Sequence, residues 1–281
     1  MKTGVFFHPI YASNYWPIMG SKFSRFPEAM KDVLDKENIE LIEPQNVDEE
    51  LLLKVHEPGI VNNLRGKPYE EGALLSVGGC VEAAERVSRG DLKNAFVFNV
   101  SAGHHAGPEK AWGGTYISCT GPMIINLKEK YNLKKVAILD TDSHHGDGTR
   151  DIFEDDPSVM HACFCSTQDL DKTGTKIDVN VGWDISDNMY MELVRKSFIS
   201  RARRFGPELI IHELGHDTCR GDYGDRGLSK DLFIQLVREI KDLAEDVCEG
   251  RYIIITMGGA KPDISEYIHP PMIRILSRYI K

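Results

Sequence analysis

The chain has 281 residues, of which 41% are hydrophobic and 27% charged, a composition that is ordinary for a soluble globular protein. Its formal net charge of −9 argues against broad nucleic-acid binding and mildly favours a neutral or cationic partner. The first residues are too polar for a signal peptide, and no run of about 18 apolar residues occurs. We therefore expect a cytoplasmic protein that does not span a membrane.

Short apolar runs that are typical of buried strands alternate with helix-like segments. Strands are predicted at residues 5–9, 95–100, 136–142, 159–165, 209–214 and 252–257, and helices at 72–89, 118–131, 188–204 and 229–247. Nearly continuous apolar strings suit strands that are buried on both faces, as in a parallel sheet. The alternation predicts an α/β fold with three αβα layers and a central, mostly parallel sheet. No linker divides the chain, so we expect a single domain over residues 1–281.

The six cysteines are scattered along the chain, and we interpret them as reduced thiols. Cys163 and Cys165 share one face of a predicted strand. Their spacing is not that of a CxxC motif and no second pair completes a zinc knuckle, so core packing is the favoured interpretation for them.

Polar clusters follow four of the predicted strands, at residues 101–114, 143–149, 215–225 and 258–263. In open α/β sheets, active sites form beyond the carboxyl ends of the strands. We therefore expect these four segments to meet at one site.

The densest of these clusters is Asp140-Thr-Asp142-Ser-His144-His145-Gly-Asp147. Carboxylate and imidazole groups suit Zn²⁺ and other divalent metals. Asp140, Asp142 and His144 alternate, so they project to one side while the chain stays extended. Asp217, in the later segment Gly-His-Asp-Thr, would complete a site of one His and two Asp. A catalytic zinc ion with three protein ligands keeps a position open for water or substrate.

A second histidine pair, His104-His105, follows another predicted strand. A metal hydrolase needs a base for its water and an acid for its leaving amine, and two histidines could provide both. Each would need a carboxylate to fix its tautomer, which Asp140 and Asp147 could supply. His216 is ambiguous at this level, since it could line a tunnel, support a ligand or be exposed.

These motifs, in this order, resemble the histone deacetylase and acetylpolyamine amidohydrolase family over roughly residues 50–262. The string D-x-D-x-H-H-G-D-G is the most specific of them. The resemblance implies an arginase-like fold, a zinc ion held by Asp142, His144 and Asp217, and a structural potassium ion near the Asp140 strand. It further implies His105 as general base and later acid, and His104 as electrostatic support. Asp140 and Asp147 would then orient His104 and His105.

Two departures from the family concern the pocket walls. Gly114 stands where the family has an aromatic residue of the acyl-lysine tunnel, and the opposite wall falls near Leu170 or Asp171. A wider or more polar pocket follows, which favours a small acylated amine over a histone. Glu213, Asp222 and Asp225 could attract an amine or polyamine at the mouth, but a solvated charged loop is the favoured interpretation for them.

The largest departure is the run Gly258-Gly259-Ala260-Lys261-Pro262-Asp263, which lacks the family's oxyanion-stabilising Tyr. Tyr267 or Tyr11 could supply the hydroxyl, Lys261 could replace it, or the enzyme could act on something other than ordinary acetamides. His8 and Tyr11, with Trp16 and Phe23, could form a substrate rim or pack in the core. His56 is expected to have a structural role.

Two other functions remain open. A binuclear manganese ureohydrolase shares the expected fold, but it would need more carboxylates than the later strand offers around Asp217. A catalytically degenerate protein that binds acyl-amines or a partner would explain the missing Tyr, but it would have no need of the His–Asp pairs. The favoured function is therefore a zinc-dependent amidohydrolase, with the oligomeric state left open.

Overall fold

The structure is a computed structural model that describes residues 1–13 and 15–278. The strands are β1 (Lys2–Phe6), β2 (Ile39–Ile42), β3 (Leu92–Val97), β4 (Val136–Asp140), β5 (Val159–Cys165), β6 (Asp169–Leu170), β7 (Lys176–Asn180), β8 (Leu209–Leu214) and β9 (Tyr252–Thr256). The helices are α1 (Ile10–Ser13), α2 (Lys31–Leu34), α3 (Glu49–Leu52), α4 (Pro58–Leu64), α5 (Glu70–Arg89), α6 (Thr120–Tyr131), α7 (Asp147–Ile152), α8 (Asp187–Val194), α9 (Ser200–Phe205), α10 (Lys230–Cys248) and α11 (Pro262–Leu276). A π-helical turn, Arg195–Ile199, joins α8 to α9, and a short 3₁₀ turn, Glu28–Met30, precedes α2.

The strands form one sheet of nine, in the order β2-β1-β3-β9-β8-β4-β5-β7-β6. Every neighbouring pair is parallel except β6 with β7, which is antiparallel. The predicted mostly parallel sheet is therefore confirmed. In the described part of the chain, no helix has the length and apolar character needed to cross a membrane.

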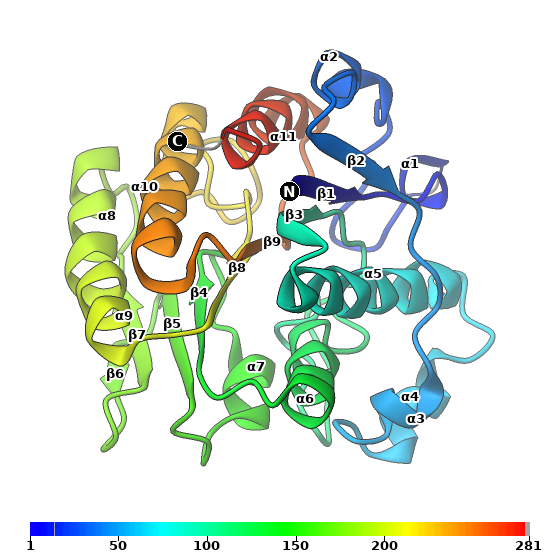
Figure 1. Ribbon diagram of the computed structural model, residues 1–281, viewed down its shortest axis with the longest axis horizontal. Helices are drawn as coiled ribbons and strands as arrows, with labels where there is room; N and C mark the ends of the chain where they lie inside the picture. The colour runs from blue at the N-terminus through cyan, green and yellow to red at the C-terminus, as the bar shows by residue number, and fades with distance from the viewer. Residues whose placement is uncertain (14, 279–281) are drawn as a thin grey trace.

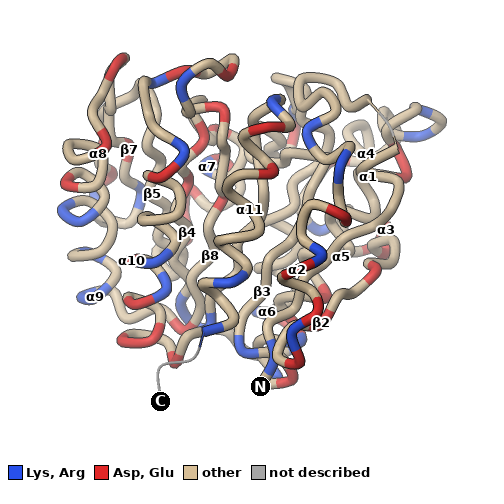
Figure 2. The backbone as a smooth tube through the Cα atoms, turned by 90° about the horizontal axis from the view of Figure 1, so that it is seen from above, with Lys and Arg blue, Asp and Glu red and all other residues tan. Residues whose placement is uncertain are grey.

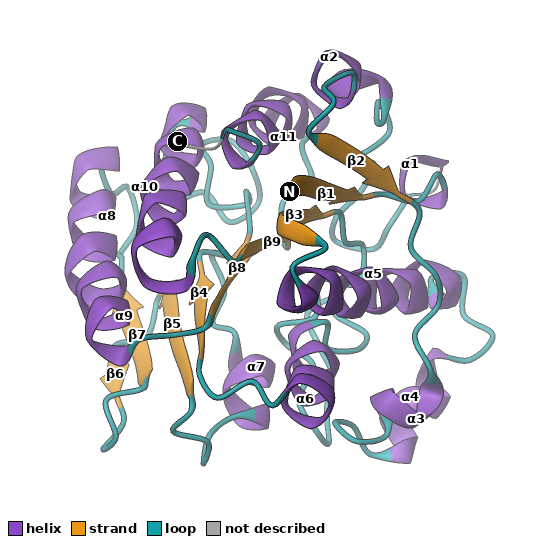
Figure 3. Cartoon of the chain, in the orientation of Figure 1, coloured by secondary structure: helices purple, strands orange, loops and turns teal. Residues whose placement is uncertain are grey.

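Helices cover both faces of the sheet, with α8 to α11 on one side and α5 to α7 on the other (Figures 1 and 3). The strand pleat sends alternate side chains into two cores. Phe96 and Phe98 enter the core under α8 to α11, whereas Ala95 and Val97 enter the core under α5 and α6. These two cores give the three αβα layers predicted from the apolar runs.

The long helices begin and end at residues suited to those positions. The Ser229 hydroxyl accepts a hydrogen bond from the Leu232 amide and starts α10, and Ser186 does the same for Met189 at the start of α8. Helix α5 ends at Gly90, whose φ of 79° is left-handed. The predicted helices 72–89 and 229–247 are thus found within two residues of their observed bounds.

The sequence analysis missed β2, β6, β7 and α11. Strand β7 begins at Lys176 and carries Asp178 at its centre, a pattern that does not predict a buried strand. Tertiary contacts satisfy both charges: Lys176 Nζ donates to the carbonyl of Val159 at 2.8 Å, and Asp178 pairs with Arg150. Helix α11 contains Pro270 and Pro271, which ordinarily argue against a helix.

Most of the aromatic residues considered for a substrate rim belong to the core. Tyr11, Trp16 and Phe23 are all at most 2% exposed, so they form no substrate rim. The Trp16 indole donates to the Tyr11 carbonyl at 3.0 Å, and Phe23 meets Phe98 edge to face. Of this group only His8 reaches the surface, where its ring lies 3.2 Å from Glu43.

Basic and acidic residues are interspersed along the outer loops and helices (Figure 2). In that view, the described residues show no extended face of a single sign. The prediction that the protein does not bind nucleic acid is consistent with this mixture and stays a prediction.

Helix α5 approaches the segment before α3 closely enough that only glycine fits at position 78. A Cβ added at Gly78 would lie 1.8 Å from the Gln45 carbonyl oxygen. We expect Gly78→Ala to lower the free energy of unfolding by about 1–3 kcal/mol, because the backbones must separate. Urea denaturation would measure the change.

Gly59→Ala is the matched control, since Gly59 also lies in a helix but has no atom within 4 Å of the added Cβ. It should be neutral or stabilising by up to about 1 kcal/mol. Equal destabilisation of both variants would contradict the close approach at Gly78.

Candidate active site

The four polar segments meet at one site because β3, β9, β8 and β4 are consecutive neighbours in the sheet. The loops that follow these strands surround a cavity of about 220 Å³. Its lining consists of Ile18, Met19, Ala102, His104, His105, Trp112, Gly113, Gly114, Thr115, Asp142, His144, Tyr223 and Gly258. The predicted convergence of the strand ends is therefore observed.

Asp142, His144 and Asp217 lie together beside the cavity and could hold a metal ion. His144 Nδ1 is 3.0 Å from Asp142 Oδ1 and 3.0 Å from Asp217 Oδ2. Both carboxylates are buried, whereas the His144 side chain is 45% exposed toward the cavity. Three ligand atoms on one side and open space on the other match a metal site with a free position.

The chemistry of these donors fits a divalent cation. Asp217 Oδ2 is buried and makes no well-formed hydrogen bond, although His144 Nδ1 lies 3.0 Å away. Burial and the charge of Asp142 together raise the pKa of Asp217 to about 7. Two buried carboxylates at such close range are costly unless a cation lies between them, and the orphaned oxygen points to where that cation would bind.

Glycines surround the carboxylates because no side chain would fit there. A Cβ at Gly146 would lie 2.2 Å from Asp140 Oδ2, and a Cβ at Gly258 would lie 2.4 Å from Asp142 Oδ2. The Gly258 amide instead donates to Asp142 Oδ2 at 2.8 Å. The glycines of both motifs therefore let backbone atoms reach the carboxylates.

The two cavity histidines each contact a carboxylate, as the sequence predicts. His104 Nδ1 is 3.0 Å from Asp140 Oδ2, and His105 Nδ1 is 2.8 Å from Asp147 Oδ1. The Trp112 indole donates to the other Asp147 oxygen at 2.8 Å, and its ring lies 4.2 Å from that of His105. Trp112 thereby fixes both Asp147 and His105, a role that the sequence analysis did not foresee.

The pKa values of these histidines shift in opposite directions. Burial alone would lower the pKa of His104, but the charges of Asp142 and Asp140 outweigh it and raise that pKa to about 10. Burial lowers the pKa of His105, and the nearby charge of His104 lowers it further, although the hydrogen bond that His105 donates to Asp147 acts to raise it. The surroundings therefore favour the protonated, cationic form of His104 and the neutral form of His105.

A tyrosine that the sequence analysis did not single out, Tyr223, lines the cavity from the loop after β8. Its ring centroid is 5.8 Å from that of His144. Its hydroxyl accepts from the Gly259 amide at 2.9 Å, so its own proton remains available to another acceptor. Burial and the charges of Asp217 and Asp142 raise the Tyr223 pKa, which keeps this proton in place.

None of the residues suggested from sequence for this role lines the cavity. Tyr11 is buried in the core, and the exposed Tyr267 donates to Asp231 at 2.7 Å. Lys261 is exposed beyond the glycine turn. The only signal for Tyr223 was its position in a glycine-containing loop shortly after Asp217.

The acidic residues considered for the mouth are engaged elsewhere. Glu213 is fully buried within the sheet, where it accepts from Thr120 and Thr149. Asp222 is also buried and accepts from the amides of Ala260 and Lys261 at 3.1 Å. Asp225 accepts from Gly221 and Gly227 within its own loop. An acidic mouth is therefore not formed by these three residues.

Two further histidines have positions that resolve the sequence-based alternatives. His216 is fully buried behind the glycine turn, 3.6 Å from Asp222, so it neither lines the cavity nor reaches solvent. His56 accepts from the Ser118 amide at 3.0 Å and contacts the Gly107 carbonyl at 2.8 Å. His56 thus stabilises the loop that carries the histidine pair, in agreement with the expected structural role.

The cavity wall at Gly114 is filled from the N-terminal loop. A Cβ added at Gly114 would lie 2.2 Å from Ile18 Cγ1. Ile18 has a φ of 65°, an unusual conformation for a β-branched residue. Together with Met19 and Trp112 it makes this wall apolar, so the expected more polar wall is not found here. Leu170 is half exposed on β6 and does not line the cavity.

The Histone deacetylase domain model matches residues 67–275, and the chain therefore belongs to the histone deacetylase family. A probable deacetylase of Archaeoglobus fulgidus is 27% identical over 296 residues, which cover 92% of this chain and 81% of the archaeal protein. The nine-stranded sheet and its helices have the arginase-deacetylase fold. The crystal structure of the HDA15 HD domain matches with a TM-score of 0.84 at 22% identity, covering 98% of this chain and 89% of that one.

Eukaryotic relatives are longer than this chain. Histone deacetylase HDA1 of Saccharomyces cerevisiae is 28% identical over 258 residues, or 84% of this chain and 36% of the yeast protein. Histone deacetylase 9 of Homo sapiens is 27% identical over 209 residues, or 66% of this chain and 20% of the human protein. Family membership indicates a metal-dependent amide hydrolase that acts on an acetylated substrate.

The metal prediction can be tested by removing one ligand. We expect Asp217→Ala to lose one equivalent of bound Zn²⁺ per chain relative to the unaltered protein, because two donors hold the ion poorly. Elemental analysis after dialysis would measure it.

Asp155→Asn is the control, because Asp155 is an exposed carboxylate outside the cavity. It should retain the full metal content. Unchanged metal content in Asp217→Ala would remove Asp217 from the ligand set.

Proposed function

We propose that the protein is a zinc-dependent amidohydrolase that removes an acyl group, in the first place acetyl, from a small amine. The observation that carries this proposal is the set of side chains facing one cavity. The donors Asp142 and His144, the pair His104 and His105, and the Tyr223 hydroxyl all line it. A protein that only bound acyl-amines would have no use for two histidines held by carboxylates.

Asp142, His144 and Asp217 would hold the zinc ion, which when bound supplies the Lewis acidity that polarises a carbonyl and acidifies water. Potassium near the Asp140 strand stays a prediction. Since the described residues offer three donors at this cavity, they support one metal ion there rather than the two of a manganese ureohydrolase.

His105 is the proposed general base. Its Nδ1 faces Asp147, so Nε2 is the nitrogen left to take a proton from the attacking water. Water adds to the acyl carbon, the carbon–nitrogen bond breaks, and Nε2 returns the proton to the departing amine. His104, held by Asp140, adds positive charge beside the reacting carbonyl.

Tyr223 would stabilise the oxyanion in place of the missing family tyrosine. A Cβ added at Gly258 would clash with both Tyr223 Oη, at 2.7 Å, and Asp142 Oδ2, at 2.4 Å. The hydroxyl is therefore next to the proposed ligands and retains a proton to donate. With this donor in place, the proposed site could hydrolyse ordinary acetamides, and no unusual substrate is needed to explain the missing family tyrosine.

The cavity walls favour a short acyl group on a small amine. Ile18, Met19 and Trp112 make one wall apolar, and the acidic residues considered for a polyamine are engaged elsewhere. A small N-acyl amine is thus a better match than a histone tail or a polyamine. Turnover of the zinc-loaded protein on acetylated peptides, polyamines and small amines would rank these classes.

Replacing the base should abolish turnover without removing the metal. We expect His105→Ala to lower kcat about 10²–10⁴-fold, the typical contribution of a positioned base. Initial rates and zinc content, measured on the same preparation, would show the separation.

His8→Ala is the control, since His8 lies at the surface beside Glu43. It should keep normal rates.

Because burial lowers the pKa of His105, the acidic limb of kcat/KM in the unaltered protein should fall below about pH 6.5. Near-normal turnover in His105→Ala would refute the assignment.

The hydroxyl of Tyr223 should matter in the transition state more than in binding. We expect Tyr223→Phe to lower kcat about 10²–10³-fold with little change in KM, because one oxyanion donor is lost. Steady-state kinetics on the best substrate of the panel would measure this. Tyr267→Phe removes an exposed hydroxyl bonded to Asp231 and should leave kcat unchanged. A large loss of kcat in Tyr267→Phe with normal kcat in Tyr223→Phe would instead assign the oxyanion-stabilising role to Tyr267.

A further inference from the structure

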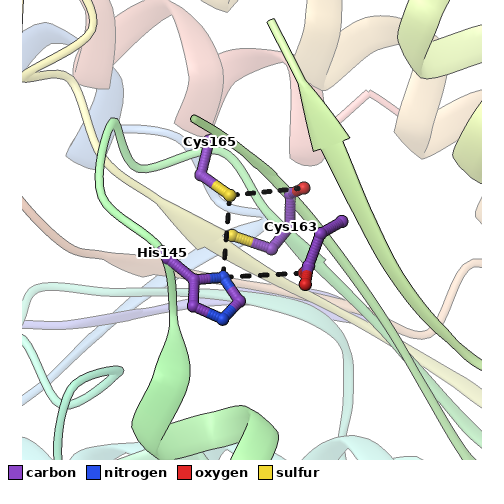
Figure 4. Close-up of side chains that lie close together, drawn as sticks. His145, Cys163 and Cys165 are labelled. Atoms are coloured by element: carbon purple, nitrogen blue, oxygen red, sulfur yellow. Dashed lines mark hydrogen bonds and ion pairs between the residues drawn. The ribbon is translucent and has the colours of Figure 1, made fainter. Parts of the chain in front are cut away.

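A second group of metal-ligand side chains lies outside the catalytic cavity, at the carboxyl ends of β5 and β7. It consists of His145, Cys163, Cys165 and Asp178. Cys163 and Cys165 alternate along β5, so they share one face, and Cys163 pairs in register with Asp178 of β7. His145 reaches the same place from the loop after β4, and Figure 4 shows its ring directed at the two sulfur atoms.

The spacing of these four groups suits a tetrahedral metal ion. His145 Nδ1 lies 3.6 Å from Cys165 Sγ and 3.6 Å from Asp178 Oδ1, and all four ligand atoms lie within 4.8 Å of one another. Zinc bonds of about 2.3 Å to sulfur and about 2.0 Å to nitrogen place tetrahedral N and S ligands about 3.5 Å apart. The ligand atoms are thus already close to the required separations.

The surroundings favour an ion over a disulfide. Both cysteines are free, and residues two apart on one strand have Cα atoms about 6.6 Å apart, at the upper limit for a disulfide. The Gly146 amide donates to Cys163 Sγ at 3.4 Å, the kind of hydrogen bond that supports a thiolate ligand. Core packing alone would not bring an imidazole and a carboxylate to these sulfurs.

The charges also balance around a divalent ion. Once a bound metal has displaced the thiol protons, the two sulfurs and the Asp178 carboxylate carry three negative charges, and Arg150 pairs with Asp178. With a neutral His145, the group lacks two positive charges, which one divalent cation supplies. Thiolate ligands select zinc and other thiophilic metals over magnesium or calcium.

We propose that His145, Cys163, Cys165 and Asp178 bind a second, thiophilic divalent ion. This ion has a structural role and takes no part in the proposed reaction itself. It ties the loop after β4 to β5 and β7, and this loop presents His144 to one side and His145 to the other. The Asp178 side chain is 5% exposed and the His145 side chain 29% exposed, so the ion would be largely enclosed with one route of entry.

Cobalt substitution tests the site, because the three proposed catalytic ligands contain no sulfur. The reduced, metal-free protein would be titrated with Co²⁺ and followed by absorption spectroscopy. We expect binding of about two equivalents per chain and a near-ultraviolet thiolate-to-cobalt charge-transfer band. One equivalent with no such band would overturn the proposal, whatever the outcome of the activity assays.

Variants assign the band to its ligands. Cys165→Ser should lose the band and one equivalent of Co²⁺, whereas Asp217→Ala should lose one equivalent and keep the band. Cys248→Ser is the matched control, because Cys248 is another buried free cysteine, which contacts the Arg251 carbonyl. It should keep both. A band that survives in Cys165→Ser would also refute the site. If that variant fails to fold, the unaltered protein and Asp217→Ala still decide.

Discussion

The structure around the cavity depends on the close approach of two buried carboxylates, Asp142 and Asp217. Main-chain amides hold both in place: His144 and Gly258 donate to Asp142, and Ser143 donates to Asp217. These amides come from the loops after β4 and β9, the two strands that flank β8, and Asp217 follows β8, so the arrangement depends on this strand order. Buried like charges are destabilising by themselves, and a bound cation is what would make the arrangement favourable.

The loop after β8 links this pair to the rest of the site. Asp222 accepts hydrogen bonds from the amides of the turn after β9, and the next residue, Tyr223, lies against that turn. The buried Arg226 donates to Ser143 and stacks on Trp183, which fixes the same loop to the one after β4. A hydroxyl can therefore reach the proposed reaction centre from a different loop than in the family pattern. The proposed reaction requires a hydroxyl at the right position, and any of several loops at this edge of the sheet can supply it.

The loop after β4 serves two sides of the molecule. His144 faces Asp142 and Asp217, and the adjacent His145 faces the two cysteines. Because the two histidines are adjacent, the contacts of His145 also constrain the position of His144, the proposed metal ligand. Neighbouring residues of an extended segment point in opposite directions, which is why one short motif can carry both sets of contacts.

The sequence by itself determined that a mostly parallel sheet lies between two helical layers, where six of its nine strands lie, and which segments gather at its edge. Apolar runs such as 252–257 can be recognised because a strand buried on both faces has few polar positions. The D-x-D-x-H-H-G-D-G string is readable because metal ligands and tight turns need particular residue types. Strand β7 and helix α11 were not readable, since the charges of Lys176 and Asp178 and the prolines of α11 are accommodated only by the folded protein.

Tertiary structure alone decided which side chain faces which space. The sequence does not distinguish Tyr11, Tyr223 and Tyr267. In the fold, Tyr11 lies in the core, Tyr223 lines the cavity and Tyr267 is at the surface. The same holds for Cys163 and Cys165, whose local pattern indicated packing and whose neighbours His145 and Asp178 come from other segments. Local sequence specifies backbone preference and hydrophobic period, whereas contacts between distant segments depend on strand order and register. Those are fixed only when the whole sheet forms.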